Sequence, residues 1–108
     1  MIKNGVRLHG VVPQMFYAAN VAEKVWLEQG FSHFAITSGI EGKHKHSSQH
    51  WEGHALDFRT WLDKNGTQMT KLQRDSLGRA LRRALSDEYV VVVEGNHIHV
   101  HWKGLKAS

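Results

Sequence analysis

The chain has 108 residues, of which 41% are hydrophobic and 22% charged, and its 14 Lys and Arg against 10 Asp and Glu give a formal net charge of +4. These values are ordinary for one globular domain, so we assign residues 1–108 to a single domain without a separate targeting module. The absence of cysteine excludes disulfide bonds, and any metal site must be built from histidine and carboxylate. No basic segment followed by an apolar run opens the chain, and no stretch approaches the roughly 20 apolar residues of a membrane span. We therefore expect no signal peptide, no membrane span and synthesis in the cytoplasm.

The first half of the chain predicts one helix, one short strand and a polar loop. Apolar residues recur at spacings of three and four from Pro13 to Trp26, and Gly30 follows, which is typical of an amphipathic helix with proline in its first turn. Phe34–Thr37 predicts a short strand that stops at the next Ser-Gly pair. The polar segment Gly39–Gln49 has no usable periodicity and is predicted to be a loop.

The next part of the chain predicts a strand and a second helix. Ala55–Arg59 is apolar enough for a strand, and alternation would place Asp57 on the same face as the two end residues of that strand. A helix is expected over Thr70–Leu85, and Gly78 within it should cost about 1 kcal/mol of stability relative to alanine. Six apolar residues are expected to share the buried face of this helix: Leu72, Leu77, Ala80, Leu81, Ala84 and Leu85.

The last part of the chain predicts a β-hairpin. Strands at Tyr89–Val93 and His97–Trp102 are joined by the tight connection Glu94–Asn96. Alternation along the second strand places His97, His99 and His101 on one face and its apolar residues on the other. The elements together predict an α+β domain: a small, mostly antiparallel sheet with two main helices packed on one face and a cleft on the other.

Histidine is concentrated in two short windows. The chain has 9 histidines, and seven of them fall within His44–His54 and His97–His101. Neutral imidazole nitrogen and carboxylate oxygen are both good zinc ligands, and three protein ligands leave the fourth position open for water. The two windows together with Asp57 therefore indicate a metalloenzyme.

Two motifs carry a resemblance to a known family. They are Ser48-x-His50-x-x-Gly53-x-Ala55-x-Asp57 and, later in the chain, His97-x-His99. The pair resembles the zinc-peptidase superfamily that joins D-Ala-D-Ala carboxypeptidases, phage peptidoglycan endopeptidases and the Hedgehog signalling domain. The resemblance covers roughly residues 35–103, and the chain is most similar in length to a phage-encoded member. It implies a Hedgehog/DD-peptidase-like fold.

The resemblance also implies roles for the residues of the two motifs. His50, Asp57 and His99 would bind zinc (Zn2+), because the second histidine of the His-x-His pair is the ligand in this family. His97 would be either a catalytic histidine or one that supports the metal ligands. Glu94 resembles the glutamate that many members place shortly before the last ligand, where it acts as general base. A second register stays open, in which His97 is the ligand and Glu94, three residues before it, is the base.

The resemblance to the zinc-peptidase superfamily also implies which residues contact the substrate. Many members hold the substrate carboxylate with an arginine soon after the Ser-Gly pair, where this chain has Ile40-Glu41-Gly42-Lys43. Lys43 or Arg59 would take the place of that arginine. Ser48 would form hydrogen bonds beside the first ligand and so support the metal shell.

The activity implied is that of a zinc metallopeptidase, a peptidoglycan hydrolase that acts as a monomer on the stem peptide. It would cut as an L-Ala-D-Glu endopeptidase or as a D-Ala-D-Ala carboxypeptidase. A bacteriophage endolysin without an export signal would reach the cell wall through a holin or on lysis, or else as a virion component. Net positive charge would favour an anionic wall.

The alternative is a non-catalytic, zinc-containing binding or structural module of the same fold. Nucleic-acid binding is disfavoured, because no aromatic residues are interleaved with the basic ones of the second helix.

Overall fold

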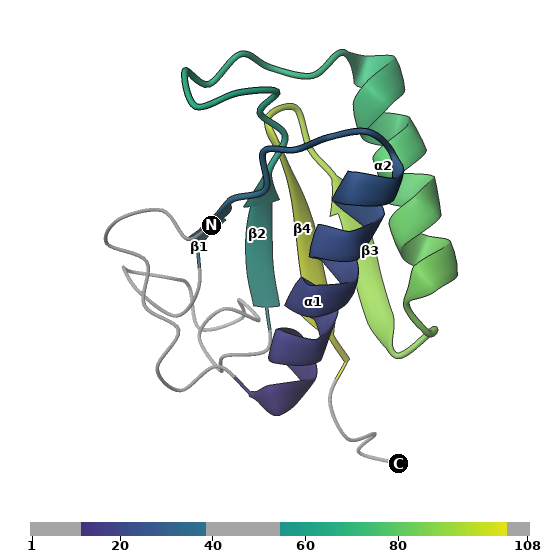
Figure 1. The fold of residues 1–108 in the computed structure, drawn as a ribbon. Coiled ribbons are helices and arrows are strands. Elements are labelled where there is room, and N and C mark those ends of the chain that lie inside the picture. The colour runs from purple at the N-terminus through teal and green to yellow at the C-terminus, as the bar shows by residue number, and fades with distance from the viewer. Residues whose placement is uncertain (1–11, 39–54, 104–108) are drawn as a thin grey trace.

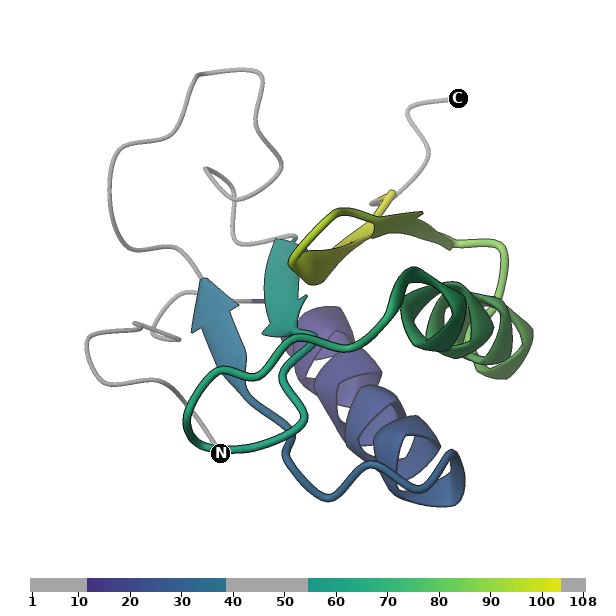
Figure 2. The same cartoon turned by 90° about the horizontal axis from the view of Figure 1, so that it is seen from above.

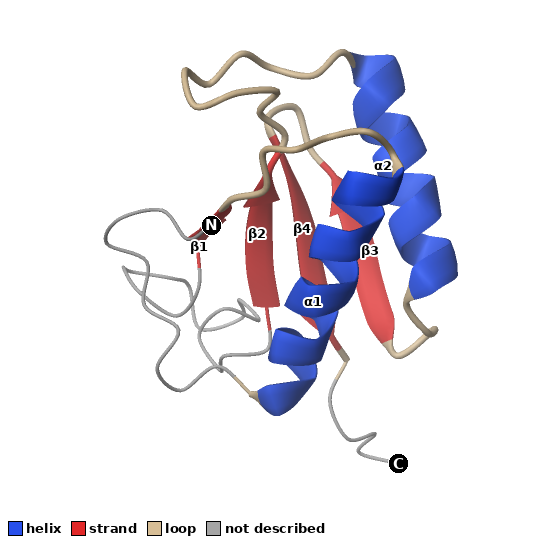
Figure 3. Ribbon diagram, in the orientation of Figure 1, coloured by secondary structure: helices blue, strands red, loops and turns tan. Residues whose placement is uncertain are grey.

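The chain forms two helices and four strands in the order α1, β1, β2, α2, β3, β4 (Figure 1). The structure is a computed structural model that describes residues 12–38 and 55–103. The elements span Pro13–Glu28 (α1), Ile36–Ser38 (β1), Ala55–Arg59 (β2), Lys71–Ala84 (α2), Tyr89–Val93 (β3) and His97–Trp102 (β4). The strands and helices separate into two layers (Figure 3), which confirms the predicted α+β class.

Both predicted helices are confirmed, and local chemistry explains their ends. α1 begins at Pro13, where the missing N–H of proline is harmless because the first helical turn has no acceptor for it. Past its end, Gly30 adopts a φ of +91°, a left-handed conformation that residues with a Cβ rarely adopt. α2 begins after a capping box: Thr70 Oγ1 accepts a hydrogen bond from the Gln73 N–H, and the Gln73 side chain accepts one from the Thr70 N–H.

The strands form one antiparallel sheet in the order β1-β2-β4-β3. β2, β3 and β4 have five or six residues each, and all three have the predicted bounds. β1 is a three-residue edge strand at Ile36–Ser38 instead of the predicted Phe34–Thr37. Phe34 lies before the strand, and its ring packs in the core against Trp26 and Phe58 at centroid distances of 5.3 Å.

Both helices cover the same face of the sheet (Figure 2). α1 contacts β2 and β4, and α2 contacts β3 and α1. The largest apolar side chains that are almost fully buried in the core are those of Met15, Trp26, Leu56, Phe58, Met69, Leu77, Leu81, Ile98 and Val100. Burial alternates along β4 and along β2 from Leu56 onward, so every second residue of these segments lies on the face away from the helices. Ala55, at the start of β2, is buried as well. Within the described part of the chain, no helix is long and apolar enough to cross a membrane.

Two residues predicted on the buried face of α2 are exposed. The Leu72 side chain is 77% exposed, and Ala84 is also exposed. Leu72 precedes the buried Leu77 by five residues, which is a rotation of about 500° and leaves it about 140° round the helix. Leu72 therefore lies off the buried face. Ala84 is only about 20° from Leu77 round the helix, but it is the last residue of α2 and is exposed there.

Candidate metal centre

Pairing of β2 with β4 brings Asp57 and His99 together. The two residues are direct antiparallel partners, and both lie on the sheet face away from the helices. Directly opposed residues have Cβ atoms about 4.5–5.5 Å apart, so their side chains can meet. His99 Nδ1 lies 2.9 Å from Asp57 Oδ1, and the two side chains are 21% and 20% exposed. A carboxylate and an imidazole, two of the side-chain types that zinc prefers, thus meet on a partly shielded surface.

The other edge of the His99 ring meets His101. His99 Nε2 lies 3.0 Å from His101 Nδ1, and the two rings are inclined at 61° with their centroids 5.2 Å apart. This inclination excludes parallel stacking and fits a hydrogen bond between ring nitrogens. Sequence reasoning placed His101 on this face but gave it no role. The signal was its spacing of two residues from His99, which makes the two histidines same-face neighbours on a strand.

The three side chains form a line and do not converge on one point. Within residues 12–38 and 55–103, no group of three His, Cys, Asp or Glu side chains is arranged to hold one metal ion. The His99 ring explains this finding, because Nδ1 faces Asp57 while Nε2 faces His101 on the opposite edge. A metal ion next to Asp57 could use only His99 Nδ1 of these two histidine rings. Such a site therefore needs a further ligand beyond the Asp57–His99 pair.

The spacing of the pair is compatible with zinc. Ligands at about 2.0–2.1 Å from a tetrahedral ion lie about 3.3 Å from one another. The 2.9 Å between Asp57 Oδ1 and His99 Nδ1 would have to open by only about 0.4 Å to match this value. Small side-chain rotations give changes of this size. The two residues therefore fit as neighbouring ligands of a zinc ion.

Arg59 and His97 are opposed next to the Asp57–His99 pair. Arg59 Nη1 donates to the backbone oxygen of Asn96 at 3.3 Å, and the guanidinium lies 5.2 Å from the ring centroid of Trp61. Arg59 Nε is buried and has no hydrogen-bond partner among the described residues. His97 Nδ1 lies 2.7 Å from Asn96 Oδ1. An amide oxygen can only accept, so in this orientation of the Asn96 amide the bond requires the proton on Nδ1, and a neutral ring then has its lone pair on Nε2.

Glu94 lies at the turn of the hairpin. Its N–H donates to the backbone oxygen of His97 at 2.9 Å, which closes the tight connection between β3 and β4. Glu94 is exposed and borders a hollow of about 190 Å³ together with Lys71 and Arg74 from the start of α2. Glu94 thus borders a hollow that α2 also lines, whereas His97 shares the sheet face of His99. The remaining predicted site residues, Lys43, Ser48 and His50, lie outside the described residues.

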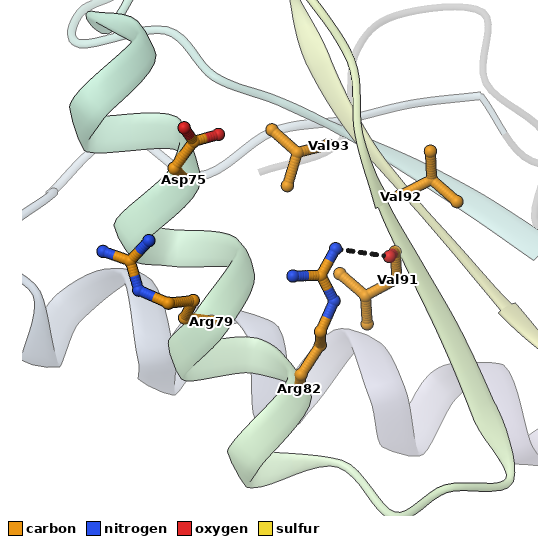
Figure 4. Close-up of a pocket in the computed structure, with 6 residues that line it drawn as sticks. All are labelled: Asp75, Arg79, Arg82, Val91, Val92 and Val93. Atoms are coloured by element: carbon orange, nitrogen blue, oxygen red, sulfur yellow. Dashed lines mark hydrogen bonds between the residues drawn. The ribbon is translucent and has the colours of Figure 1, made fainter.

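A larger hollow, of about 550 Å³, opens between α2 and β3 (Figure 4). It is lined by Asp75, Arg79 and Arg82 from the helix and by Val91, Val92 and Val93 from the strand. Arg82 Nη2 donates to the Val91 oxygen at 2.9 Å. β3 is an edge strand, so this bond satisfies a backbone group that would otherwise be open to another chain.

Three more charged side chains of α2, those of Lys71, Arg74 and Asp75, also have intramolecular partners. A hydrogen bond from Lys71 at 2.8 Å holds the pKa of Asp75 below its ordinary value of 3.8. Arg74 Nη1 donates to the Met69 oxygen at 2.6 Å. These bonds use basic side chains of α2 to stabilise the fold. None of the predicted site residues that the structure describes lines the α2–β3 hollow, so the described histidines are separate from it.

The sequence matches no known family model, and no curated protein or solved structure matches it. The functional proposal therefore depends on the geometry of the site and on the two motifs.

Proposed function

We propose that the protein is a zinc-dependent peptidase that hydrolyses a peptide bond in bacterial peptidoglycan, with a Hedgehog/DD-peptidase-like arrangement of its site. The observation that carries the proposal is the contact between Asp57 Oδ1 and His99 Nδ1 across β2 and β4. These residues are 42 positions apart and belong to the two separate motifs. The setting we propose is a phage lytic enzyme or a virion component that acts on the wall.

Three residues would hold the zinc ion. Asp57 and His99 would supply an oxygen and a nitrogen from rigid strands, and His50, which lies outside the described residues, would supply a second nitrogen. When bound at such a site, zinc lowers the pKa of a water molecule and polarises the carbonyl of the scissile bond. Asp57 compensates the charge of the ion, and the sheet fixes its position relative to His99.

His97 is the better placed of the two candidate proton carriers. It is two residues before His99 on the same face, which is about 7 Å along the strand. Asn96 holds its Nδ1–H, so the Nε2 lone pair is available to take a proton from a reacting group and return it to the leaving amine. A substrate bound between the two histidines would be within reach of both.

Arg59 is the described residue that would hold a substrate carboxylate. It lies opposite His97, and Trp61 and the Asn96 carbonyl restrain its guanidinium. Arg59 is thus oriented before any substrate arrives, which lowers the cost of ordering it on binding. Both proposed bonds, L-Ala-D-Glu and D-Ala-D-Ala, have a carboxylate on the residue that follows the scissile bond. Lys43 and Ser48 would complete the substrate contacts.

A non-catalytic zinc module is the second candidate function. The observation that favours it is the position of Glu94, which is exposed and borders the hollow next to α2. A protein without a general base near the metal would bind zinc and a partner but would not turn over. The two candidates share the ligands and differ in what Glu94 and His97 do.

The first experiment measures lysis of purified peptidoglycan as a loss of turbidity and a release of amines. Zinc-loaded wild type, chelator-treated wild type, zinc-restored wild type, His50→Ala and the isosteric variant Asp57→Asn are compared. Only the first and third should act, and mass spectrometry of the fragments names the bond. Activity that survives both the chelator and Asp57→Asn would refute a zinc peptidase.

The second experiment separates the peptidase from the module. Glu94→Gln and His97→Gln are tested for zinc content and for lysis. In a peptidase, loss of the proton carrier leaves zinc bound but lowers the rate by roughly 100-fold or more. Wild-type protein that holds one zinc per chain and releases nothing from peptidoglycan would favour the module.

A further inference from the structure

We propose that His101 is a positioning residue for the metal centre: it accepts a hydrogen bond from the Nε2–H of His99 and so leaves the Nδ1 lone pair of His99 for the metal. This inference rests on the proposed zinc site. The observation behind it is the 3.0 Å contact between His99 Nε2 and His101 Nδ1, which lies on the ring edge opposite Asp57.

The role of His101 follows from the protons of a neutral imidazole. Such a ring carries one N–H and one lone pair, so only one nitrogen of His99 can be a metal ligand while the other donates. If Nδ1 binds the metal beside Asp57, the proton must lie on Nε2, and Nε2 needs an acceptor in its half-buried position. His101 Nδ1 is that acceptor at ordinary hydrogen-bond distance, and the proton of His101 then lies on its own Nε2.

The contacts among Asp57, His99 and His101 can also form without a metal, but the donor and the acceptor of the bond between the two histidines are then exchanged. In the absence of the ion, the Nδ1–H of His99 donates to the carboxylate of Asp57, and the Nδ1–H of His101 donates to His99 Nε2. Metal binding reverses the direction of the bond between the histidines. Both rings stay neutral in each arrangement, so two protons are present before and after. Only the positions of the two protons on the rings change.

The fold gives His101 the space and the direction for this role. It alternates onto the same face as His99, and its strand partner on β2 is Ala55, whose side chain is a single methyl group. Direct ligation by His101 of an ion shared by Asp57 and His99 Nδ1 is excluded by the ring geometry, since His101 meets the opposite edge of His99. The position is therefore that of an orienting partner of a ligand.

The test uses two variants of matched shape. Asn has an amide atom where His101 has Nδ1 and can accept the bond, whereas Leu has the same branching and no acceptor. Zinc affinity of wild type, His101→Asn and His101→Leu is measured by competition with a chromophoric chelator. His101→Leu should lose roughly 10- to 100-fold in affinity, the range found for loss of an outer-shell partner, and His101→Asn should retain most of the wild-type affinity.

A second measurement detects the proton on His99 Nε2 directly by NMR. In the zinc-loaded wild type and in His101→Asn, the Nε2–H of His99 should give a nitrogen–proton NMR signal that is protected from solvent exchange. This signal should be lost in His101→Leu. The melting temperature of metal-free His101→Leu should fall by no more than the loss of one partly exposed hydrogen bond explains, because neither substitution touches the core. Loss in His101→Leu with rescue in His101→Asn is a result that a merely structural role would not give.

The outcomes separate this inference from the proposed function. Wild-type protein that binds no zinc overturns the metal centre and, with it, the role of His101. Tight zinc binding by wild type and equally tight binding by His101→Leu overturns the role of His101 alone. An equal loss of affinity in His101→Asn and His101→Leu also overturns it, because the accepting atom would then make no difference.

Discussion

Replacing Gly78 with alanine should destabilise the protein, although alanine is the better helix former. Gly78 is buried in α2, and a Cβ at this position would overlap Val93 Cγ2. Helix propensity alone favours alanine by about 1 kcal/mol. Overpacking of this kind costs about 1–3 kcal/mol, and β-branched Val93 has few rotamers into which it can retreat. The balance is a loss of about 1 kcal/mol in the free energy of unfolding, which lowers the melting temperature by about 4–8 °C for a domain of this size.

A double-mutant cycle tests this reasoning. Urea unfolding is measured for wild type, Gly78→Ala, Val93→Ala and the double variant. In the Val93→Ala background the overlap is absent, so Gly78→Ala should become stabilising by up to about 1 kcal/mol. The coupling energy is then about 2 kcal/mol, far above the roughly 0.5 kcal/mol expected for independent sites. If Gly78→Ala stabilises both backgrounds equally, the close approach of α2 to β3 is not what selects glycine here.

Three further predictions test the fold. Leu81→Ala truncates a fully buried side chain and should lower the free energy of unfolding by about 2–5 kcal/mol. Leu72→Ala, on the exposed side of α2, should change it by less than about 0.5 kcal/mol. Equal effects of the two variants in urea unfolding would contradict the burial pattern. Thr70→Ala breaks the capping box of α2 and should cost about 1 kcal/mol in thermal unfolding, while Thr70→Ser, which can still accept the bond, should cost much less. Hydrogen bonding by Thr67 holds the pKa of Asp63 below its ordinary value of 3.8. The stabilisation from this bond is thus present above the pKa of the unfolded state and is lost as the pH falls through the lowered pKa of the folded state. Thr67→Val should raise the pKa of Asp63 in an NMR titration, and an unchanged value would mean that another group sets it.

Local patterns in the sequence were sufficient for most of the elements. The helices, β2 and the hairpin follow from spacing, caps and alternation, which depend only on neighbours along the chain. The exceptions are places where packing decided. Phe34 lies outside β1, and its ring packs in the core against Phe58. In the sequence Gly78 is only a weak helix former, whereas in the structure it makes room for Val93. Neither effect has a local signature, because each depends on a side chain from a distant segment.

The sequence by itself determined which residues of each strand share a face, since alternation assigns each residue of a strand to one of two faces. It thus placed Asp57 of β2, and the histidines of β4, on the face opposite the apolar residues of their own strand. Only the tertiary structure decided which of them meet. The register that pairs Asp57 with His99 is set by packing of the opposite faces of β2 and β4 against the helices, and a shift by one residue would move every side chain to the other face. The orientation of the His99 ring, with one nitrogen toward Asp57 and the other toward His101, depends on three side chains meeting in space and could not be read from their spacing.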